Sequence, residues 1–250
     1  MEGLYLPGET RLHRLPAQVK VVAAVLFALV VVATPREHVA AFVGYAMLVA
    51  GLTVLARIPP ALQLRRMAIE LPFVIFAVLL PFVGRGERIQ VGPFALSEEG
   101  LWAAWNILAK GTLGVAVAVV LAATTRPSDL VGGMARLRLP PLLVQIFGFM
   151  VRYVDVVAAE AARMRTAMAA RGFRARHVRA WPAVARSLGA LFIRTYERGE
   201  RIHVAMLSRG YDGTARAWAM GSVAAPPAAW ALGLALPGAA VAIGLATWLR

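Results

Sequence analysis

Five long apolar runs constrain this chain more than any other feature of its sequence. Each approaches the roughly 20 residues that a helix needs to cross a ~30 Å hydrocarbon core, and 60% of the 250 residues are hydrophobic. Lipid offers no partner to backbone polar groups, so such runs are expected to be helical. The sequence therefore predicts an all-α integral membrane protein with about five transmembrane helices. The runs cover residues 19–34, 38–56, 67–84, 101–125 and 228–249.

Arginine and lysine set the expected orientation, because loops rich in these residues stay in the cytoplasm. The net charge is +14, and its densest part is residues 126–216, with sixteen arginines against six acidic residues. An N-terminus in the cytoplasm puts every strongly basic segment on that side, and the last run then ends outside. We therefore expect a multi-pass protein of the bacterial inner (plasma) membrane. The other basic positions on the cytoplasmic side are Arg11, Arg14, Lys20, Arg57, Arg65 and Arg66.

Three regions follow from this pattern. Residues 1–125 form an N-terminal membrane region with four spans, 126–216 a cytoplasmic coupling-helix region, and 217–250 a C-terminal transmembrane helix. The middle region is not a disordered tail, because its apolar residues recur at helical spacing. It is expected to hold two long helices, which begin near Pro141 and Pro182, and a short surface helix within 127–138.

A short word occurs twice in the basic region. "AMAARGF" covers 167–173 and "AMLSRGY" covers 205–211. Both fit a helix that ends in a Schellman motif, in which glycine takes the left-handed position and the next residue meets the one five positions earlier. The expected supporting contacts pair Met168 with Phe173 and Met206 with Tyr211.

Helix termination explains each copy, but it does not require the same pattern twice. We interpret the repeat as a shared docking task in which each helix tip presents an arginine. A planar guanidinium suits a partner's groove that bears carboxylates or backbone carbonyls. Coincidence, or a duplication without function, is the alternative.

At these words the chain resembles the transmembrane coupling subunit (T component) of energy-coupling-factor (ECF) transporters. That family carries a pair of Ala-Arg-Gly words at the ends of two cytoplasmic coupling helices. Here they read "AARG" at 169–172 and "LSRG" at 207–210, with Ser208 in place of the second alanine. The segment "RTYERGERIHVAMLSRGYDG" at 194–213 is similar to the cobalt/nickel branch, the CbiQ-like permeases. At the N-terminus, "RLHRLPAQVK" resembles the family's entry segment but lacks its usual Asp-Pro-Arg.

The resemblance implies a non-catalytic subunit of an ATP-driven importer. Its partners would be two ABC-type ATPase subunits, which carry ATP and Mg²⁺, and a CbiM-like substrate-binding membrane subunit; a small accessory membrane subunit is also compatible. Co²⁺ is the expected substrate, with Ni²⁺ next and a vitamin third, and no residue here chooses among them chemically. The chain itself is expected to bind no cofactor and no metal. The implied ATPase-docking residues are Ala170, Arg171, Gly172, Ser208, Arg209 and Gly210.

Other classes of function are disfavoured by residues that the sequence lacks. It has no G-x-x-x-x-G-K-[ST] phosphate loop, no catalytic cluster, no cysteine, and four histidines without metal-site spacing. Its arginines lie on amphipathic helices between spans, so no nucleic-acid partner is expected. Glu70 and Lys110 lie near the ends of their spans, where we favour a structural role. The open alternatives are a conventional ABC-type permease and a stand-alone membrane carrier or channel with a basic docking region.

Overall fold

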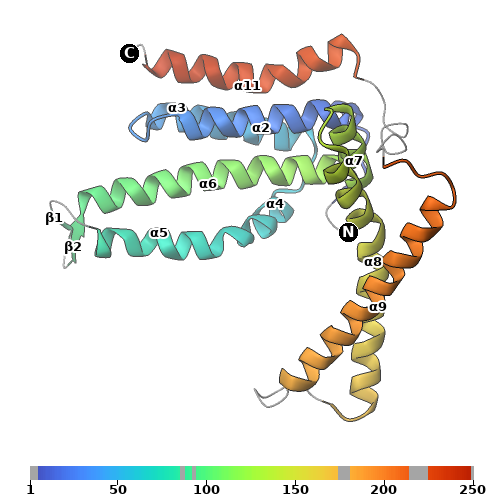
Figure 1. Cartoon of the computed structure of the whole chain (residues 1–250). Helices are drawn as coiled ribbons and strands as arrows, with labels where there is room; N and C mark the ends of the chain where they lie inside the picture. Colours follow the sequence, from blue (N-terminus) through green and yellow to red (C-terminus); the bar gives the residue numbers. More distant parts are fainter. Residues whose placement is uncertain (1–4, 85–87, 92–93, 174–180, 214–224, 249–250) are drawn as a thin grey trace. The chain divides into compact units, whose positions relative to one another are not determined.

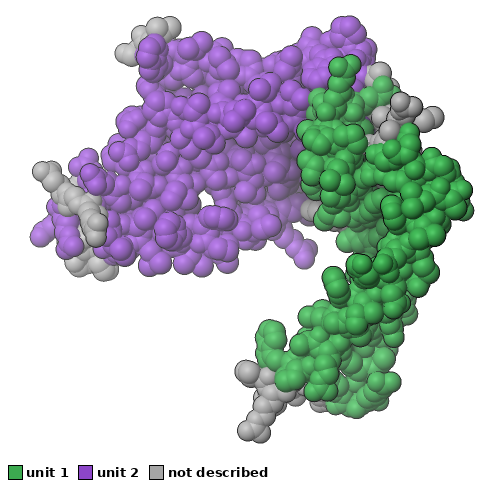
Figure 2. All heavy atoms as spheres, in the orientation of Figure 1, with its two compact units in different colours: residues 1, 134–221 green, residues 2–133, 222–250 purple. Residues whose placement is uncertain are grey.

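A computed structural model describes residues 5–84, 88–91, 94–173, 181–213 and 225–248. The chain forms two compact units, which Figure 2 colours separately. We call residues 2–133 and 222–250 the bundle unit, and residues 134–221 the crossed-helix unit. Each is described by itself.

The bundle unit is built from apolar helices arranged around α6 (Figure 1). Helix α6 contacts α2, α3 and α5, while α11 packs on α2 and α3. A short 3-10 segment, η2, joins α4 to α5. The elements are α1 (Arg11–Arg14), α2 (Ala17–Ala33), α3 (Val39–Leu55), α4 (Pro60–Met67), η2 (Ala68–Glu70), α5 (Leu71–Val83), α6 (Glu98–Thr124), α7 (Pro127–Arg136, whose last residues belong to the other unit) and α11 (Pro227–Trp248).

The structure contains a small β-hairpin that the sequence pattern did not predict. Strands β1 (Arg88–Val91) and β2 (Phe94–Ser97) pair antiparallel, with Arg88 opposite Ser97. Ser97 then caps α6, because its hydroxyl accepts a hydrogen bond from the Gly100 amide at 3.2 Å. Two glutamates in the first turn of α6 favour that helix start through the helix dipole. The hairpin thus leads into a well-capped helix without changing the all-α class.

Aromatic side chains form the centre of the bundle core. The Tyr45 ring lies edge-on to Phe27 and to Phe42, with centroids 6.0 Å apart in both pairs. Phe42 makes a similar contact with Trp105, at 6.1 Å. The buried Tyr45 hydroxyl lies 3.0 Å from that of Thr34. Edge-to-face packing of this kind adds specificity to apolar burial.

All five predicted spans fall on helices, but the lengths of these helices differ from those of the predicted spans. Four helical stretches in the described part of the chain are long and apolar enough to cross a membrane: Pro60–Val83, Glu98–Thr124, Pro141–Ala170 and Pro227–Trp248. Helices α2 and α3 are apolar but have only 17 residues each. The stretch Pro141–Ala170 lies in the region expected to be cytoplasmic, so that placement stays a prediction.

Two lysines cap the C-terminal ends of membrane helices. The Lys110 ammonium donates to the Val32 carbonyl in the last turn of α2, and Lys20 donates to the Thr124 carbonyl at the end of α6, each at 2.8 Å. The last carbonyls of a helix have no partner within it, and a cation also suits the helix dipole there. Lys110 lies in the middle of α6 rather than near the end of its span, so its expected position was wrong, and its structural role stays a prediction. Glu70 is buried, and its carboxylate lies against Gly111.

Candidate functional site

Both arginine–glycine words lie on one pair of antiparallel helices that cross. Helices α8 (Pro141–Ala170) and α9 (Trp181–Leu207) pack on each other, as Figure 1 shows. Met168, near the end of α8, meets Ser187, near the start of α9. Gln145, near the start of α8, meets Tyr211, just beyond the end of α9. The C-terminal ends of α8 and α9 therefore lie at opposite ends of the pair.

The end of α8 has the backbone geometry of a Schellman motif. Gly172 is left-handed, with φ +76°. Its amide donates to the Ala169 carbonyl, and the Phe173 amide donates to the Met168 carbonyl, both at 3.0 Å. These are the two hydrogen bonds that define the motif. The backbones of Phe173 and Met168 thus meet, and the supporting contact of their side chains stays a prediction.

The end of α9 repeats this geometry. Gly210 has φ +80°, and its amide donates to the Leu207 carbonyl at 3.0 Å. The Tyr211 amide donates to the Met206 carbonyl at 3.1 Å. The two words thus specify the same helix end at two places in the fold.

The arginines of the two words are exposed at these tips. The side chains of Arg171 and Arg209 are both exposed. Within the described ranges, neither guanidinium has a hydrogen bond or an ion pair. Ala170 and Ser208, one position earlier in each word, are exposed as well. The arrangement leaves each five-donor fork available to an external acceptor. Their docking role is a prediction that the fold alone does not test.

Residues outside the words fasten each tip to the opposite helix. The Ser187 hydroxyl lies 3.1 Å from the Met168 sulfur and 3.0 Å from the Ala183 carbonyl of its own helix, so its single proton is shared between the two acceptors. At the other end, the Tyr211 hydroxyl donates to the Gln145 side-chain oxygen at 2.5 Å, and the Gln145 amide donates to the Gly213 carbonyl at 2.9 Å. Sequence reasoning missed Gln145 and Ser187, because nothing in their local pattern shows what lies some 66 or 19 residues away.

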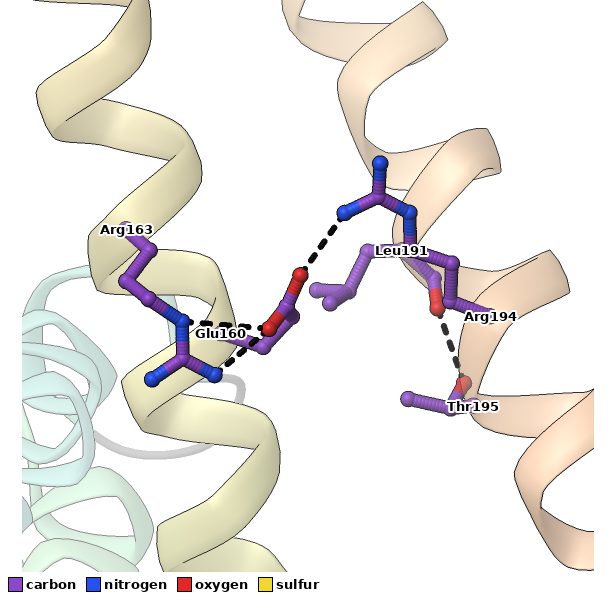
Figure 3. A network of polar contacts seen from close by, with 5 residues as sticks. All are labelled: Glu160, Arg163, Leu191, Arg194 and Thr195. Atoms are coloured by element: carbon purple, nitrogen blue, oxygen red, sulfur yellow. Dashed lines mark hydrogen bonds and ion pairs between the residues drawn. The ribbon is translucent and has the colours of Figure 1, made fainter.

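An ion-pair network joins the helices between these two ends (Figure 3). Glu160 on α8 accepts from Arg194 on α9 at 2.7 Å and from Arg163, one turn further along α8, at 2.5 Å. The Glu160 side chain is 18% exposed, whereas both arginines are more than 60% exposed. A hollow of about 210 Å³ lies beside the network, lined by residues of both helices. Exposed ion pairs are weak, so the network orients the crossing without locking it.

The described residues offer no metal site. No group of three or more His, Asp or Glu side chains among them is placed to hold an ion.

Comparison with known proteins identifies the family. The family model described as "CbiQ: Cobalt transport protein" matches residues 8–218, a range that includes both arginine–glycine words. The chain belongs to the CbiQ family. The resemblance to coupling subunits of ECF transporters, stated from the sequence, is confirmed.

Relatives of this CbiQ-family chain are named either as energy-coupling factor transporter subunits or as cobalt transport proteins. The energy-coupling factor transporter transmembrane protein EcfT of Thermanaerovibrio acidaminovorans is 31% identical over 229 residues, covering 84% of this chain and 82% of the relative. The cobalt transport protein CbiQ of Rhodobacter capsulatus is 31% identical over 140 residues, 55% of this chain and 57% of the relative. A putative fused cobalt transport protein CbiMQ of Methanocorpusculum labreanum is 28% identical over 210 residues, 81% of this chain and 35% of the relative.

Family membership and apolar helices together make this chain a multi-pass membrane protein and a transporter component. This favours the coupling-subunit interpretation over a stand-alone carrier or channel. It leaves the substrate, the particular partners and the roles of individual residues to be proposed.

Proposed function

We propose that this chain is the coupling subunit of an ECF-type importer for Co²⁺ or Ni²⁺. It joins two ABC-type ATPase subunits to a separate CbiM-like membrane subunit that binds the substrate. The family description and the CbiQ relative support cobalt. The relative whose name describes a fusion of CbiM with CbiQ supports the CbiM-like partner.

One observation carries the proposal: the two exposed arginines lie at opposite ends of one crossed-helix pair. Helix α9 has 27 residues, which at 1.5 Å per residue is a length of about 40 Å. Arg171 and Arg209 are therefore separated by about that length. Two similar tips so far apart suit two copies of one partner, or two related subunits of a dimer. A single small ligand could not contact both.

Each tip is built to transmit movement of its partner to the helix pair. A guanidinium docked in a groove is held by directional, charge-assisted hydrogen bonds. The Schellman turn fixes each arginine to its own helix, and the Met168–Ser187 and Gln145–Tyr211 contacts fix each tip to the other helix. Closure of the ATPases would then change the crossing of α8 and α9, where the weak network of Glu160 permits two packings.

The ends of the bundle helices support a cytoplasmic N-terminus. Helices α2, α4 and α11 begin at the same end of the bundle at which α3 and α6 finish, as their antiparallel order requires. Seven basic residues lie within or next to these helix ends, against Glu9 and Asp129 among the described residues. The positive-inside rule assigns this end to the cytoplasm of a bacterial inner membrane. The basic residues are Arg11, Arg14, Lys20, Arg57, Arg65, Arg66 and Arg126.

Charge reversal at the two tips tests the proposal. The chain would be co-expressed with an ABC ATPase pair and a CbiM-like subunit, and purified as wild type, Arg171→Glu, Arg209→Glu and the double variant. Arg198→Glu is the matched control, because it reverses an exposed arginine of α9 that lies eleven residues from both Ser187 and Arg209 and so away from both tips. The measurements are co-purification of the ATPases and ATP-driven uptake of radiolabelled Co²⁺.

We expect each single change to weaken uptake, and the double change to abolish it and to release the ATPases. The control should keep both properties. If the double variant retained its ATPases and transported Co²⁺ normally, the words would be helix caps only. Uptake of Ni²⁺ but not Co²⁺ by the wild type would correct the substrate without affecting the coupling role.

A further inference from the structure

A second basic site lies in the bundle unit. A hollow of about 720 Å³ opens between the N-terminal segment and the end of α3. Its walls come from residues just outside the apolar parts of α2 and α3, so it lies at the boundary between hydrocarbon and water. The lining residues are Leu6, Pro7, Gly8, Glu9, Thr10, Arg11, His13, Leu55, Ala56 and Arg57.

Two arginines in the wall of this hollow are without partners in the described part of the chain. Arg11 and Arg57 are both exposed, and no hydrogen bond or ion pair to another described residue involves either guanidinium. The one acidic residue of the wall, Glu9, lies 3.8 Å from Arg14. The negative charge of Glu9 is therefore partly neutralised by a third arginine, Arg14, and the wall of the hollow carries a net positive charge.

Arg57 holds an unfavourable backbone conformation at this place. It ends α3 in a Schellman turn, in which the Arg57 amide donates to the Val54 carbonyl at 2.9 Å and the Ile58 amide donates to the Thr53 carbonyl at 3.1 Å. Its φ is +54°, in the left-handed region where glycine is normally found. This strained backbone places the Arg57 side chain at the wall of the hollow.

The N-terminal segment that forms the opposite wall is itself ordered by a side chain. The His13 Nε2 lies 3.1 Å from the Leu6 carbonyl, and its Nδ1 lies 2.6 Å from the Thr10 hydroxyl. With Nε2 as the donor and Nδ1 as the acceptor, a neutral ring satisfies both contacts. The Leu6 amide also donates to the Ala123 carbonyl at the end of α6, at 2.9 Å. Arg11, the first residue of α1, is thus presented from an ordered segment.

An apolar hollow lies close to this basic one, because Leu12 and Leu52 of its wall belong to the same hydrophobic cluster as Leu6 and Ala56 of the basic wall. It has a volume of about 70 Å³ and is lined almost entirely by aliphatic side chains. It shares the two elements of the basic hollow, because Leu12 and Leu15 come from α1 and its end, and Leu52 comes from the last turn of α3. A ligand that fills both must carry a negative charge and a hydrocarbon chain side by side.

We propose that these two hollows bind one anionic phospholipid, with its phosphate at Arg11 and Arg57 and the start of an acyl chain along Leu12, Leu15 and Leu52. Basic hollows beside membrane helices attract anionic headgroups in this way. A free phosphate ion would use the arginines but leave the apolar hollow without a role. The site is independent of the tips at Arg171 and Arg209, so its failure would leave the proposed coupling function untouched.

Lipid titration of the purified full chain tests the site. The delipidated protein in a neutral detergent would be titrated with dioleoyl-phosphatidylglycerol, and retained lipid would be counted by native mass spectrometry. Dioleoyl-phosphatidylcholine is the uncharged comparison, and inorganic phosphate is the competitor. The variants are Arg11→Gln, Arg57→Gln and the double change, all at exposed positions where folding should be preserved. The matched control is Arg138→Gln, because Arg138 is also exposed and left-handed, with φ +58°, but does not line the hollow.

We expect one tightly retained phosphatidylglycerol, at least ten-fold preferred over phosphatidylcholine and not displaced by millimolar phosphate. Each single change should weaken its retention about five-fold, and the double change more than twenty-fold, since each arginine near a headgroup contributes about one such factor. Arg138→Gln should bind like the wild type. Equal retention by the double variant and the wild type would overturn the proposal. Displacement by phosphate alone would also overturn it, because the hollow would then be a phosphate site rather than a lipid site.

Discussion

The carboxylate of Glu160 on α8 and the guanidinium of Arg194 on α9 lie 2.7 Å apart at the crossing of the two helices. Because the Arg194 side chain is 62% exposed, this contact is expected to be weak and sensitive to salt. It is a contact that can break and reform as the crossing changes.

A double-mutant cycle should detect this contact and its salt dependence. Glu160→Gln and Arg194→Gln are expected to be non-additive in thermal unfolding at about 0.05 M NaCl and additive at about 1 M, where charges are screened within about 3 Å. Arg163→Gln is the control, because Arg163 pairs with Glu160 from within α8 and not across the crossing. In a separate measurement of Co²⁺ uptake, Arg163→Gln should reduce transport less than Arg194→Gln does. Additivity of Glu160→Gln and Arg194→Gln at both salt concentrations would mean that the helices are not coupled here.

Glycine-to-alanine changes should have opposite effects at the tips and within α9. Gly172→Ala and Gly210→Ala place a Cβ in the left-handed region, at φ +76° and +80°, and each should destabilise the chain by about 1 kcal/mol. Gly199→Ala lies within a helix with nothing near its Cβ, so it should stabilise by up to about 1 kcal/mol. Thermal unfolding of the three variants gives the comparison. A stabilising Gly172→Ala would show that the end of α8 is not a Schellman turn.

Replacing the two arginines that have a left-handed backbone with glycine should stabilise the chain, which is the opposite of the effect expected at Gly172 and Gly210. Arg57→Gly and Arg138→Gly relieve backbone strain at φ +54° and +58°, and each should stabilise the detergent-purified chain by about 1 kcal/mol. Arg57→Gln and Arg138→Gln keep the strain, so they separate the backbone effect from the loss of charge. If Arg57→Gly stabilised the chain and also lost phosphatidylglycerol, the result would show that the Arg57 backbone is strained and that its side chain binds the lipid.

The sequence predicted the helices and both helix tips well, because these depend on local chemistry. Long apolar runs, and glycine followed by an aromatic residue, carry their signals within a few residues. The link between Gln145 and Tyr211 joins residues 66 positions apart, which no local pattern reveals. The β-hairpin at 88–97 is too short for a clear alternation, and the basic hollow needs α3 and the N-terminus to meet in space. The thirty residues of α8 match the long helix that the sequence predicted to begin near Pro141.

Close packing of α11 on α2 gives a further prediction. A Cβ added at Gly233 would lie 2.0 Å from the Val19 side chain, whereas one added at Gly238, also in α11, would meet nothing within 4 Å. Gly233→Ala should therefore destabilise the chain by about 1–3 kcal/mol through overpacking, and Gly238→Ala should be neutral or stabilising. Thermal unfolding in detergent measures both. Equal stability of the two variants would mean that α2 and α11 do not pack at this point.

His13 makes the N-terminal segment sensitive to mild acid. Partial burial lowers the pKa of the His13 imidazole, the nearby Lys20 ammonium lowers it further, and the contact with the Leu6 carbonyl offsets part of the effect. Because the pKa in the folded state lies below the unfolded value of about 6.5, the unfolded chain binds more protons at low pH. The contribution of His13 to stability is therefore full above about pH 6.5 and is lost as the pH falls below it.

The measurement is thermal unfolding between about pH 5 and 8 for the wild type and His13→Gln, whose side-chain amide can still donate to the Leu6 carbonyl but does not titrate. The melting temperature of the wild type should fall relative to the variant only on the acid side. His203→Gln is the control, because His203 is exposed on α9 and its change should leave the acid side unaltered. A wild type that gained stability relative to His13→Gln on acidification would mean that the His13 ring is charged in the folded protein, and its neutral contacts with Thr10 and Leu6 would be wrong.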